Sequence, residues 1–158
     1  MAARDVMFIS VLIFALAIGV FVLHHTAGSI VSGMVGVGSI NESNTTVTVL
    51  RDFETATNGF DYFVIGTFFA SVIGLIVTGW FVGGKPIFMF FYFLVVVIAV
   101  ITSMLLSNVW ETTTTASVFG TRISFFPLTN HLMNNLPLYI AIVGVIGIIV
   151  MFAKPQEV

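Results

Sequence analysis

The chain has 158 residues, of which 58% are hydrophobic and only 8% are charged, whereas about 25% of the residues in a soluble domain are charged. Its formal net charge of −2 provides no basic surface for nucleic acid. It contains no cysteine, which excludes disulfides, thiolate metal sites and cysteine nucleophiles within this sequence.

All the charged residues lie outside four long apolar stretches. Each stretch holds about 16–21 residues, which at ~1.5 Å per residue is close to the ~30 Å hydrocarbon core of a bilayer. An ionised side chain at the bilayer centre costs at least ~2.5–3.5 kcal/mol, so a charge-free stretch of this length indicates a membrane span. The sequence therefore predicts an all-α membrane protein with one membrane domain: a bundle of four transmembrane helices with two long loops on one side. The stretches are Val6–Leu23, Tyr62–Val82, Ile87–Leu106 and Leu138–Ala153.

The first stretch is longer than the apolar part of a signal peptide, and no clear small-residue cleavage site follows it. We therefore expect a retained helix. The next segment, Thr26–Ile40, is small and apolar, and it has Ile30, Met34 and Val37 at helical spacing. This spacing favours an extension of the first helix to about residue 38 over a segment lying along the membrane surface.

A polar and acidic loop is expected over Asn41–Phe60, in which Thr45–Val49 alternates like a short strand. Asp61 then begins the second helix, where the helix dipole favours an acidic side chain. Gly83-Gly84 are suitable C-cap residues, and Lys85-Pro86 starts the third helix. So short a turn makes the second and third helices an antiparallel hairpin.

The second long loop covers Val109–Leu136, and Pro137 opens the fourth helix. A polar cluster comes shortly before this proline. We interpret the cluster as supplying turns and the N-cap of the fourth helix, and the alternative is a recognition surface. Its members are Asn130, His131, Asn134 and Asn135.

Four spans place both ends of the chain on the same side of the membrane. That side has three basic residues, whereas the other side has two basic residues and most of the acidic ones. The positive-inside rule then predicts that both ends are cytoplasmic and that the two long loops face away from the cytoplasm. The basic residues are Arg4, Lys85 and Lys154 on the first side and Arg51 and Arg122 on the second.

Small residues recur at three- or four-residue spacing in three of the predicted helices. Such a stripe lets a second backbone approach closely in lipid. We interpret the stripes as packing positions inside the bundle, and the alternative is contact with another protein. The positions are Ala15 and Gly19 in the first helix, Gly66, Ala70, Gly74 and Thr78 in the second, and Ala141, Gly144 and Gly147 in the fourth.

The three histidines are the candidate ligands for a metal or haem. His24 and His25 lie at the end of the first apolar stretch, and His131 lies in the last loop. Adjacent histidines point in different directions on a helix, whereas a metal site needs several ligands together. We therefore expect histidines at the membrane interface and no metal, cofactor or catalytic set.

Four short stretches together resemble small membrane proteins of tailless icosahedral viruses, which enclose a lipid membrane beneath a double-jelly-roll capsid. The resemblance covers roughly residues 58–154. It implies a structural protein that populates the inner membrane of the virion and links it to the capsid shell, with no catalytic residues to transfer. The stretches are Asn58–Phe63, Gly79–Phe88, Ser107–Glu111 and Phe126–His131.

The leading hypothesis is a non-enzymatic structural protein of a membrane, located in the virion membrane and the host membrane if it is viral. Its expected partners are the lipid bilayer and other membrane or capsid proteins, in an oligomer or in many copies, without nucleic acid. A holin-like pore or small transport protein is one alternative, and an accessory subunit of a membrane complex is another. The expected partner contacts are Asp52, Glu54, Glu111, Arg122, Asn130 and His131.

Overall fold

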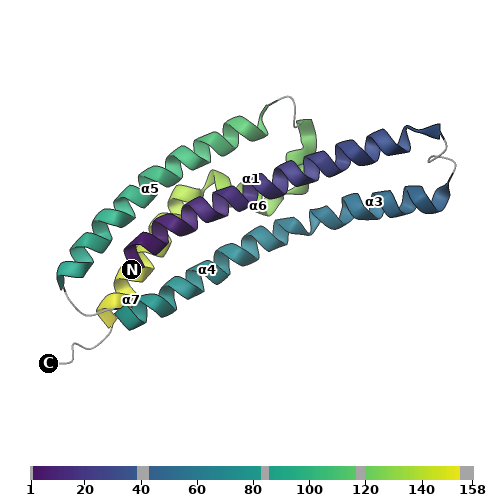
Figure 1. The fold of residues 1–158 in the computed structure, drawn as a ribbon. Coiled ribbons are helices and arrows are strands. Elements are labelled where there is room, and N and C mark those ends of the chain that lie inside the picture. The colour runs from purple at the N-terminus through teal and green to yellow at the C-terminus, as the bar shows by residue number, and fades with distance from the viewer. Residues whose placement is uncertain (1, 39–42, 83–85, 117–119, 154–158) are drawn as a thin grey trace.

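The computed structural model describes residues 2–38, 43–82, 86–116 and 120–153, and this part of the chain is a bundle of long helices without strands (Figure 1). The helices are α1 (Ala2–Val35), α3 (Asn44–Asn58), α4 (Phe60–Val82), α5 (Pro86–Thr114), the short 3₁₀ helix η1 (Gly120–Phe125), α6 (Pro127–Asn134) and α7 (Leu136–Ala153).

Three helices of the described chain are long and apolar enough to cross a membrane. They are α1, the nearly straight helix formed by α3 and α4 together, and α5. A fourth is counted if α6 and α7, which are bent by 71° relative to each other, form one span. The predicted all-helical architecture is thus confirmed for the described residues, with three or four helices that could span a membrane.

Helix α1 packs between α4 and α5, and α7 closes the bundle against α4 and α5 (Figure 1). The core is apolar and includes Ile13 and Phe21 of α1, Phe68 of α4 and Ile140 of α7, all nearly inaccessible. The outward positions of the same helices are also apolar, for example Ile73, which is 62% exposed. Apolar surface on both sides is what a helix surrounded by lipid requires.

The described ends of the chain lie at one end of the bundle. The start of α1 and the end of α7 are found there, together with the end of α4 and the start of α5 (Figure 1). This arrangement is the one expected for antiparallel neighbours joined by short connections. The turn residues 83–85 lie outside the described residues.

The predicted loop at Asn41–Phe60 is wrong for most of its length, because residues 44–58 form helix α3. Ser43 is the N-cap, and its side chain accepts a hydrogen bond from the backbone N–H of Thr46. The threonine–valine alternation at Thr45–Val49 is helical, not a strand. Packing of α3 along α1 overrides the local β-propensity, which depends strongly on context.

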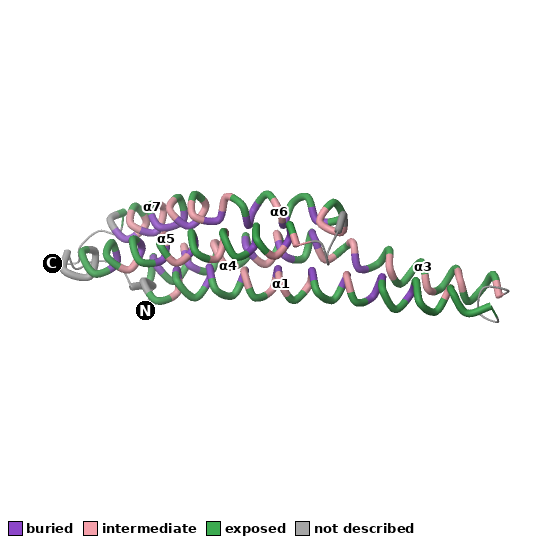
Figure 2. The backbone as a smooth tube through the Cα atoms, turned by 90° about the horizontal axis from the view of Figure 1, so that it is seen from above, coloured by how far each residue is buried: buried purple, intermediate pink, exposed green. Residues whose placement is uncertain are grey.

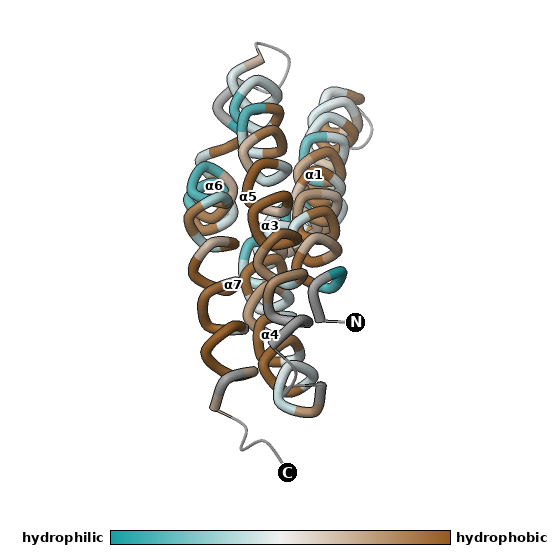
Figure 3. Tube along the Cα trace, turned by 90° about the vertical axis from the view of Figure 1, so that its left-hand side faces the viewer, coloured by the Kyte–Doolittle hydropathy of each residue, from teal (hydrophilic) through white to brown (hydrophobic). Residues whose placement is uncertain are grey.

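The second predicted loop, Val109–Leu136, is also largely helical. Helix α5 continues to Thr114, and the hydroxyls of Thr112 and Thr113 donate to carbonyl oxygens four residues earlier in the helix. η1 and α6 then fold over the end of the bundle before α7 begins at Leu136. Figure 3 shows mainly hydrophobic residues along α7 and a mixture of hydrophilic and hydrophobic ones on α6, so polarity falls from α6 to α7 at the bend.

An arm projects from one end of the bundle. Helix α1 has 34 residues, which at ~1.5 Å per residue is about 51 Å, well beyond the ~30 Å hydrocarbon core. Its last turns, residues 26–35, run beside α3 past the ends of α5, α6 and α7 (Figures 1 and 2). We call residues 26–35 and α3 the arm. Extension of the first helix beyond its apolar stretch agrees with the spacing of Ile30 and Met34.

Candidate functional site: the polar junction at the base of the arm

Buried polar side chains collect where the arm leaves the bundle. His24, Thr57, Asp61 and Thr129 are each at most 3% exposed, and Trp110 is fully buried beside them in the core. They come from α1, α3, α4, α6 and α5, so five helices meet at this level. We call this group, with Glu54, Arg122 and Asn130, the polar junction.

Asp61 caps helix α6. Its Oδ1 accepts the backbone N–H of Thr129 at 2.7 Å, and its Oδ2 accepts that of Leu128 at 3.1 Å. These N–H groups belong to the first turn of α6, where no partner exists within the helix. A carboxylate at this position also interacts favourably with the helix dipole. Asp61 lies in the first turn of its own helix, as expected, and it also joins α4 to α6.

His24 and Thr57 connect α1 to α3. The hydroxyl of Thr57 donates to the carbonyl oxygen of Glu54 at 2.6 Å, so its only proton is already used. The Nδ1 of His24 lies 2.6 Å from the same hydroxyl oxygen, and we assign it as the donor on this ground. The imidazole ring also contacts the rings of Phe125 and Phe126, with centroid distances of 5.1 and 5.0 Å.

Arg122 connects η1 to both helical segments of the arm, α3 and the end of α1. Its Nη1 lies 2.6 Å from Oε1 of Glu54, and both side chains are about a quarter exposed. The guanidinium rests on α1 at Gly28, where an added Cβ would meet Nη1 at 2.5 Å. Glycine at this position therefore allows the arginine to reach Glu54 across the surface of α1.

Trp110 fixes the end of α5 against α6. Its indole Nε1–H donates to Oδ1 of Asn130 at 3.0 Å. Its ring packs on Phe21, with a centroid distance of 5.6 Å, and Phe21 in turn meets Phe126 edge-on at 6.2 Å. The tryptophan is thus a packing residue of the core and does not face the membrane surface as an aromatic belt residue would.

The junction is suited to holding segments together, because its contacts join helices that are far apart in the sequence. Asp61 binds backbone N–H groups, and Glu54 pairs with Arg122. The His24 Nδ1 meets the Thr57 hydroxyl, whereas the His24 Nε2 and the Thr129 hydroxyl are buried without a hydrogen-bond partner among the described residues. Within the described residues there is no group of three or more histidine, aspartate or glutamate side chains that could hold a metal ion.

The predicted partner contacts divide into two groups. Glu54, Arg122 and Asn130 belong to the polar junction and are engaged within the chain. Asp52, Glu111 and His131 are exposed and remain available to a partner. The sequence missed His24, Thr57 and Asp61 as junction residues. The available signal for His24 and Asp61 was their position, since each directly adjoins an apolar stretch. Thr57 lies inside the polar segment 41–60, and the sequence carried no such signal for it.

The polar cluster before the last helix is divided between α6 and the turn into α7. The carbonyl of Asn135 accepts the backbone N–H of Tyr139 at 3.1 Å, the first helical bond of α7, so Asn135 holds the N-cap position as expected. Asn130 to Asn134 lie in α6, and Asn135 is the C-cap of that helix, with its side-chain amide donating to the carbonyl of His131. Helix α7 follows directly at Leu136. The predicted loop before the last helix is therefore wrong at Pro127–Asn134, which form the separate short helix α6.

The stripes of small residues differ in where they face. Gly144 and Gly147 pack inside the bundle, against Val96 and the ring of Tyr92, as expected. Gly66, Ala70, Gly74 and Thr78 of α4 are exposed, as are Ala15 and Gly19 of α1. Among the described residues, nothing lies within 4 Å of a Cβ added at Gly19, Gly66 or Gly74. The internal-packing interpretation is therefore wrong for these two stripes.

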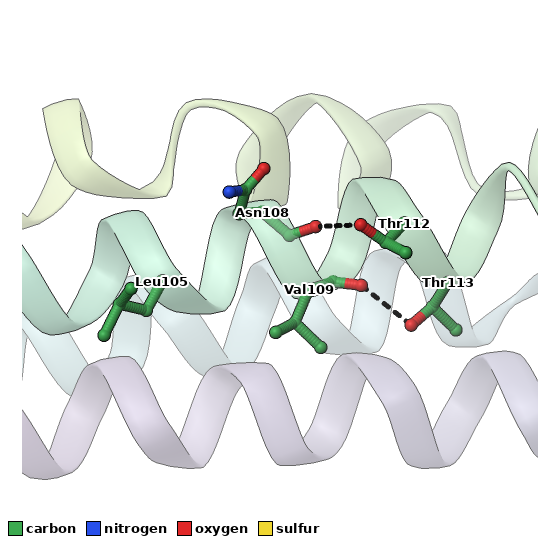
Figure 4. A pocket seen from close by; sticks show the side chains of 5 residues that line it. All are labelled: Leu105, Asn108, Val109, Thr112 and Thr113. Atoms are coloured by element: carbon green, nitrogen blue, oxygen red, sulfur yellow. Dashed lines mark hydrogen bonds between the residues drawn. The ribbon is translucent and has the colours of Figure 1, made fainter.

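A shallow depression on the outer flank of α5 is lined by Leu105, Asn108, Val109, Thr112 and Thr113 (Figure 4). Thr112 donates to the carbonyl of Asn108 at 2.9 Å, and Thr113 donates to that of Val109 at 2.7 Å. Since both hydroxyl protons are used within the helix, this surface offers little to orient a polar ligand.

Comparison with known proteins gave no match to a family model, to a curated protein or to a solved structure.

Proposed function

We propose that the chain is a non-enzymatic structural protein of a membrane, which anchors a neighbouring protein layer. In this proposal a bundle of four transmembrane helices holds the chain in the bilayer, and the arm extends from the membrane surface to the layer. The resemblance to virus membrane proteins suggests the setting, a virion membrane beneath its capsid.

The arm is the observation that supports this proposal. It carries the charged residues Arg51 and Asp52, which are exposed, on a helix that continues directly from α4. The junction braces its base through Glu54 and Arg122 and through His24 and Thr57. A helical projection tied to a membrane bundle can hold two layers at a defined spacing, whereas a flexible loop of the same length has no fixed end-to-end distance.

The decisive experiment locates the chain and then removes its exposed charges. Mass spectrometry of purified virions, isolated respiratory complexes and host membranes would identify the assembly that contains the protein. In that assembly, the double variant Arg51→Gln/Asp52→Asn should release the protein layer at lower salt than the unaltered chain. The control Arg4→Gln changes a charge at the opposite end and should have no effect. Equal release by both variants would contradict the anchoring role.

A pore is the main competing function, and the hydroxyls within the spans are the residues to consider for it. Thr67, Ser71, Thr78 and Thr102 each donate to a carbonyl of their own helix, which satisfies them without a polar channel. Reconstituted liposomes provide the test. Dye leakage well above that of empty liposomes, abolished by Thr78→Val, would favour the pore over the structural role.

A further inference from the structure

An uncharged face runs along one side of α1 and the α3–α4 helix, and it is hollowed by two adjoining grooves of about 350 and 390 Å³. Both grooves include Gly19 and Leu23, so they form one continuous depression. The first groove is lined by Ala15, Leu16, Gly19, Val20, Leu23, Phe60 and Phe63. The second is lined by Gly19, Val22, Leu23, Thr26, Ala27, Ile30 and Phe53. We call these linings together the groove face.

The outer half of the groove face lies beyond the apolar stretches of the chain. Phe53 stands between the charged residues Asp52 and Glu54, and it is 57% exposed. Ile30 follows Gly28, on which the Arg122 guanidinium rests, and it is 55% exposed. Val49, one turn before Phe53, is 61% exposed. The charge-free stretches are long enough to fill the ~30 Å hydrocarbon core by themselves. We therefore infer that these side chains lie outside the hydrocarbon and would face water in a lone chain.

Two classes of occupant are therefore poorly matched to the groove face. Lipid can cover the inner half, at Ala15 and Phe63, but not the outer half at Ile30 and Phe53. A soluble protein can cover the outer half but cannot enter the bilayer. The occupant that fits is a membrane protein with an uncharged face both in the hydrocarbon and just outside it.

A second copy of this chain has such a face at the same depth. All copies in one membrane insert in the same orientation, so two groove faces can meet about a twofold axis along the membrane normal. Such an axis places each outer half against the other outer half and each inner half against the other inner half.

The exposed area is of the size that a dimer needs. Seven large apolar side chains on or beside the groove face are partly exposed, and at ~150–200 Å² of surface each they offer on the order of 600 Å². A standard interface buries ~800 Å² per partner, and the small residues of the groove supply further area. The seven are Val22, Leu23, Ile30, Met34, Val49, Phe53 and Phe63, with exposed fractions between 38% and 61%.

We propose that two copies of the chain associate in parallel through the groove face, with the arms paired outside the membrane. Exposed apolar area of this extent outside lipid commonly marks a protein interface. The proposal does not depend on the link to a protein layer, because the two arms can pair whether or not a layer binds them.

Single cysteines test the proposal cleanly, because the chain has none of its own. Phe53→Cys and Leu23→Cys should be joined by a short bismaleimide in native membranes, giving a product of twice the chain mass. Thr55→Cys is the control. It is exposed at nearly the same height, but it is turned by about 160° around the helix from Phe53. We expect at least a tenfold lower dimer yield for Thr55→Cys.

Three results would overturn the proposal. The first is an equal yield at positions 53 and 55, and the second is a product whose mass requires a different protein. The third is a single-copy mass for the unaltered chain extracted in polymer nanodiscs, a measurement that needs no variant to fold. Release of the protein layer by the Arg51→Gln/Asp52→Asn variant tests the anchoring role separately, so the two proposals can fail independently.

Discussion

At the scale of single residues, the structure depends on a few polar contacts between segments far apart in the sequence. Asp61 and the N–H groups it binds in α6 are separated by 67 and 68 positions. The side chain is 3% exposed, so water cannot replace it if it is removed. As a hydrogen-bond acceptor, Asp61 therefore contributes more to the free energy of unfolding than a capping residue on the surface does.

We expect Asp61→Ala to lower the free energy of unfolding by about 1–3 kcal/mol, because the buried N–H of Thr129 and the partly buried N–H of Leu128 lose their acceptor. Thermal unfolding in detergent, followed by circular dichroism, would measure the loss. Asp52→Ala removes an exposed carboxylate from the arm and serves as the control. A similar change in both variants would show that Asp61 does not cap α6.

Small residues provide a second prediction. A side chain at Gly144 would collide with Val96 in the core, whereas Gly74 faces outward with free space beside it. Gly144→Leu should therefore destabilise the isolated chain by about 1–3 kcal/mol through overpacking, and Gly74→Leu should leave its stability nearly unchanged. Unfolding of the two purified variants in the same detergent compares them directly. Loss of stability in Gly74→Leu alone would mean that the α4 stripe is packed in the monomer.

These glycines also show what a sequence alone can predict. The spacing of small residues in α4 correctly marks one side of the helix, because helical periodicity is fixed by geometry. It does not indicate whether that side faces the bundle or the lipid, since both environments are apolar. The buried side of α4 is set by larger residues, Val64, Phe68 and Leu75, which would be equally acceptable facing lipid.

At the scale of whole elements, the long apolar helices were predictable and the polar ones were not. Charge-free stretches gave α1, α4, α5 and α7 because the bilayer admits little else. α3 and α6 are short and polar, and each packs against neighbours distant in the sequence. Their local signals, alternating threonines in α3 and clustered asparagines in α6, are more typical of strands and turns. Tertiary packing decides their structure.

The arm should be held by its buried base more than by its surface charges. Thr57→Val keeps the shape of the side chain but removes the acceptor of the His24 Nδ1–H, which leaves a buried donor unpaired. We expect a loss of about 1–3 kcal/mol of local stability and faster amide hydrogen exchange throughout α3. Thr55→Val makes the same change at an exposed position and should leave exchange unaltered. Unchanged protection in Thr57→Val would show that the histidine contact does not hold the arm.

At the scale of the whole molecule, the bundle is asymmetric along its length. One end holds the described ends of the chain, the end of α4 and the start of α5, and the other end holds the polar junction, α6 and the arm (Figure 1). Applied to the basic residues of the sequence, the positive-inside rule predicts that the arm faces away from the cytoplasm. A structural anchor would then present its braced and charged end to the partner layer.

Orientation follows as a prediction that two single-cysteine variants can test. Thr55→Cys lies on the exposed surface of the arm, and Arg4→Cys lies at the exposed start of α1. In intact cells, an impermeant maleimide should label Thr55→Cys fully and Arg4→Cys only after the membrane is permeabilised, since the two positions are on opposite sides of the bilayer. Labelling of both variants at similar rates without permeabilisation would mean that α1 does not cross the membrane. Labelling of Arg4→Cys alone would reverse the orientation and place the arm in the cytoplasm, where a layer outside the membrane could not reach it.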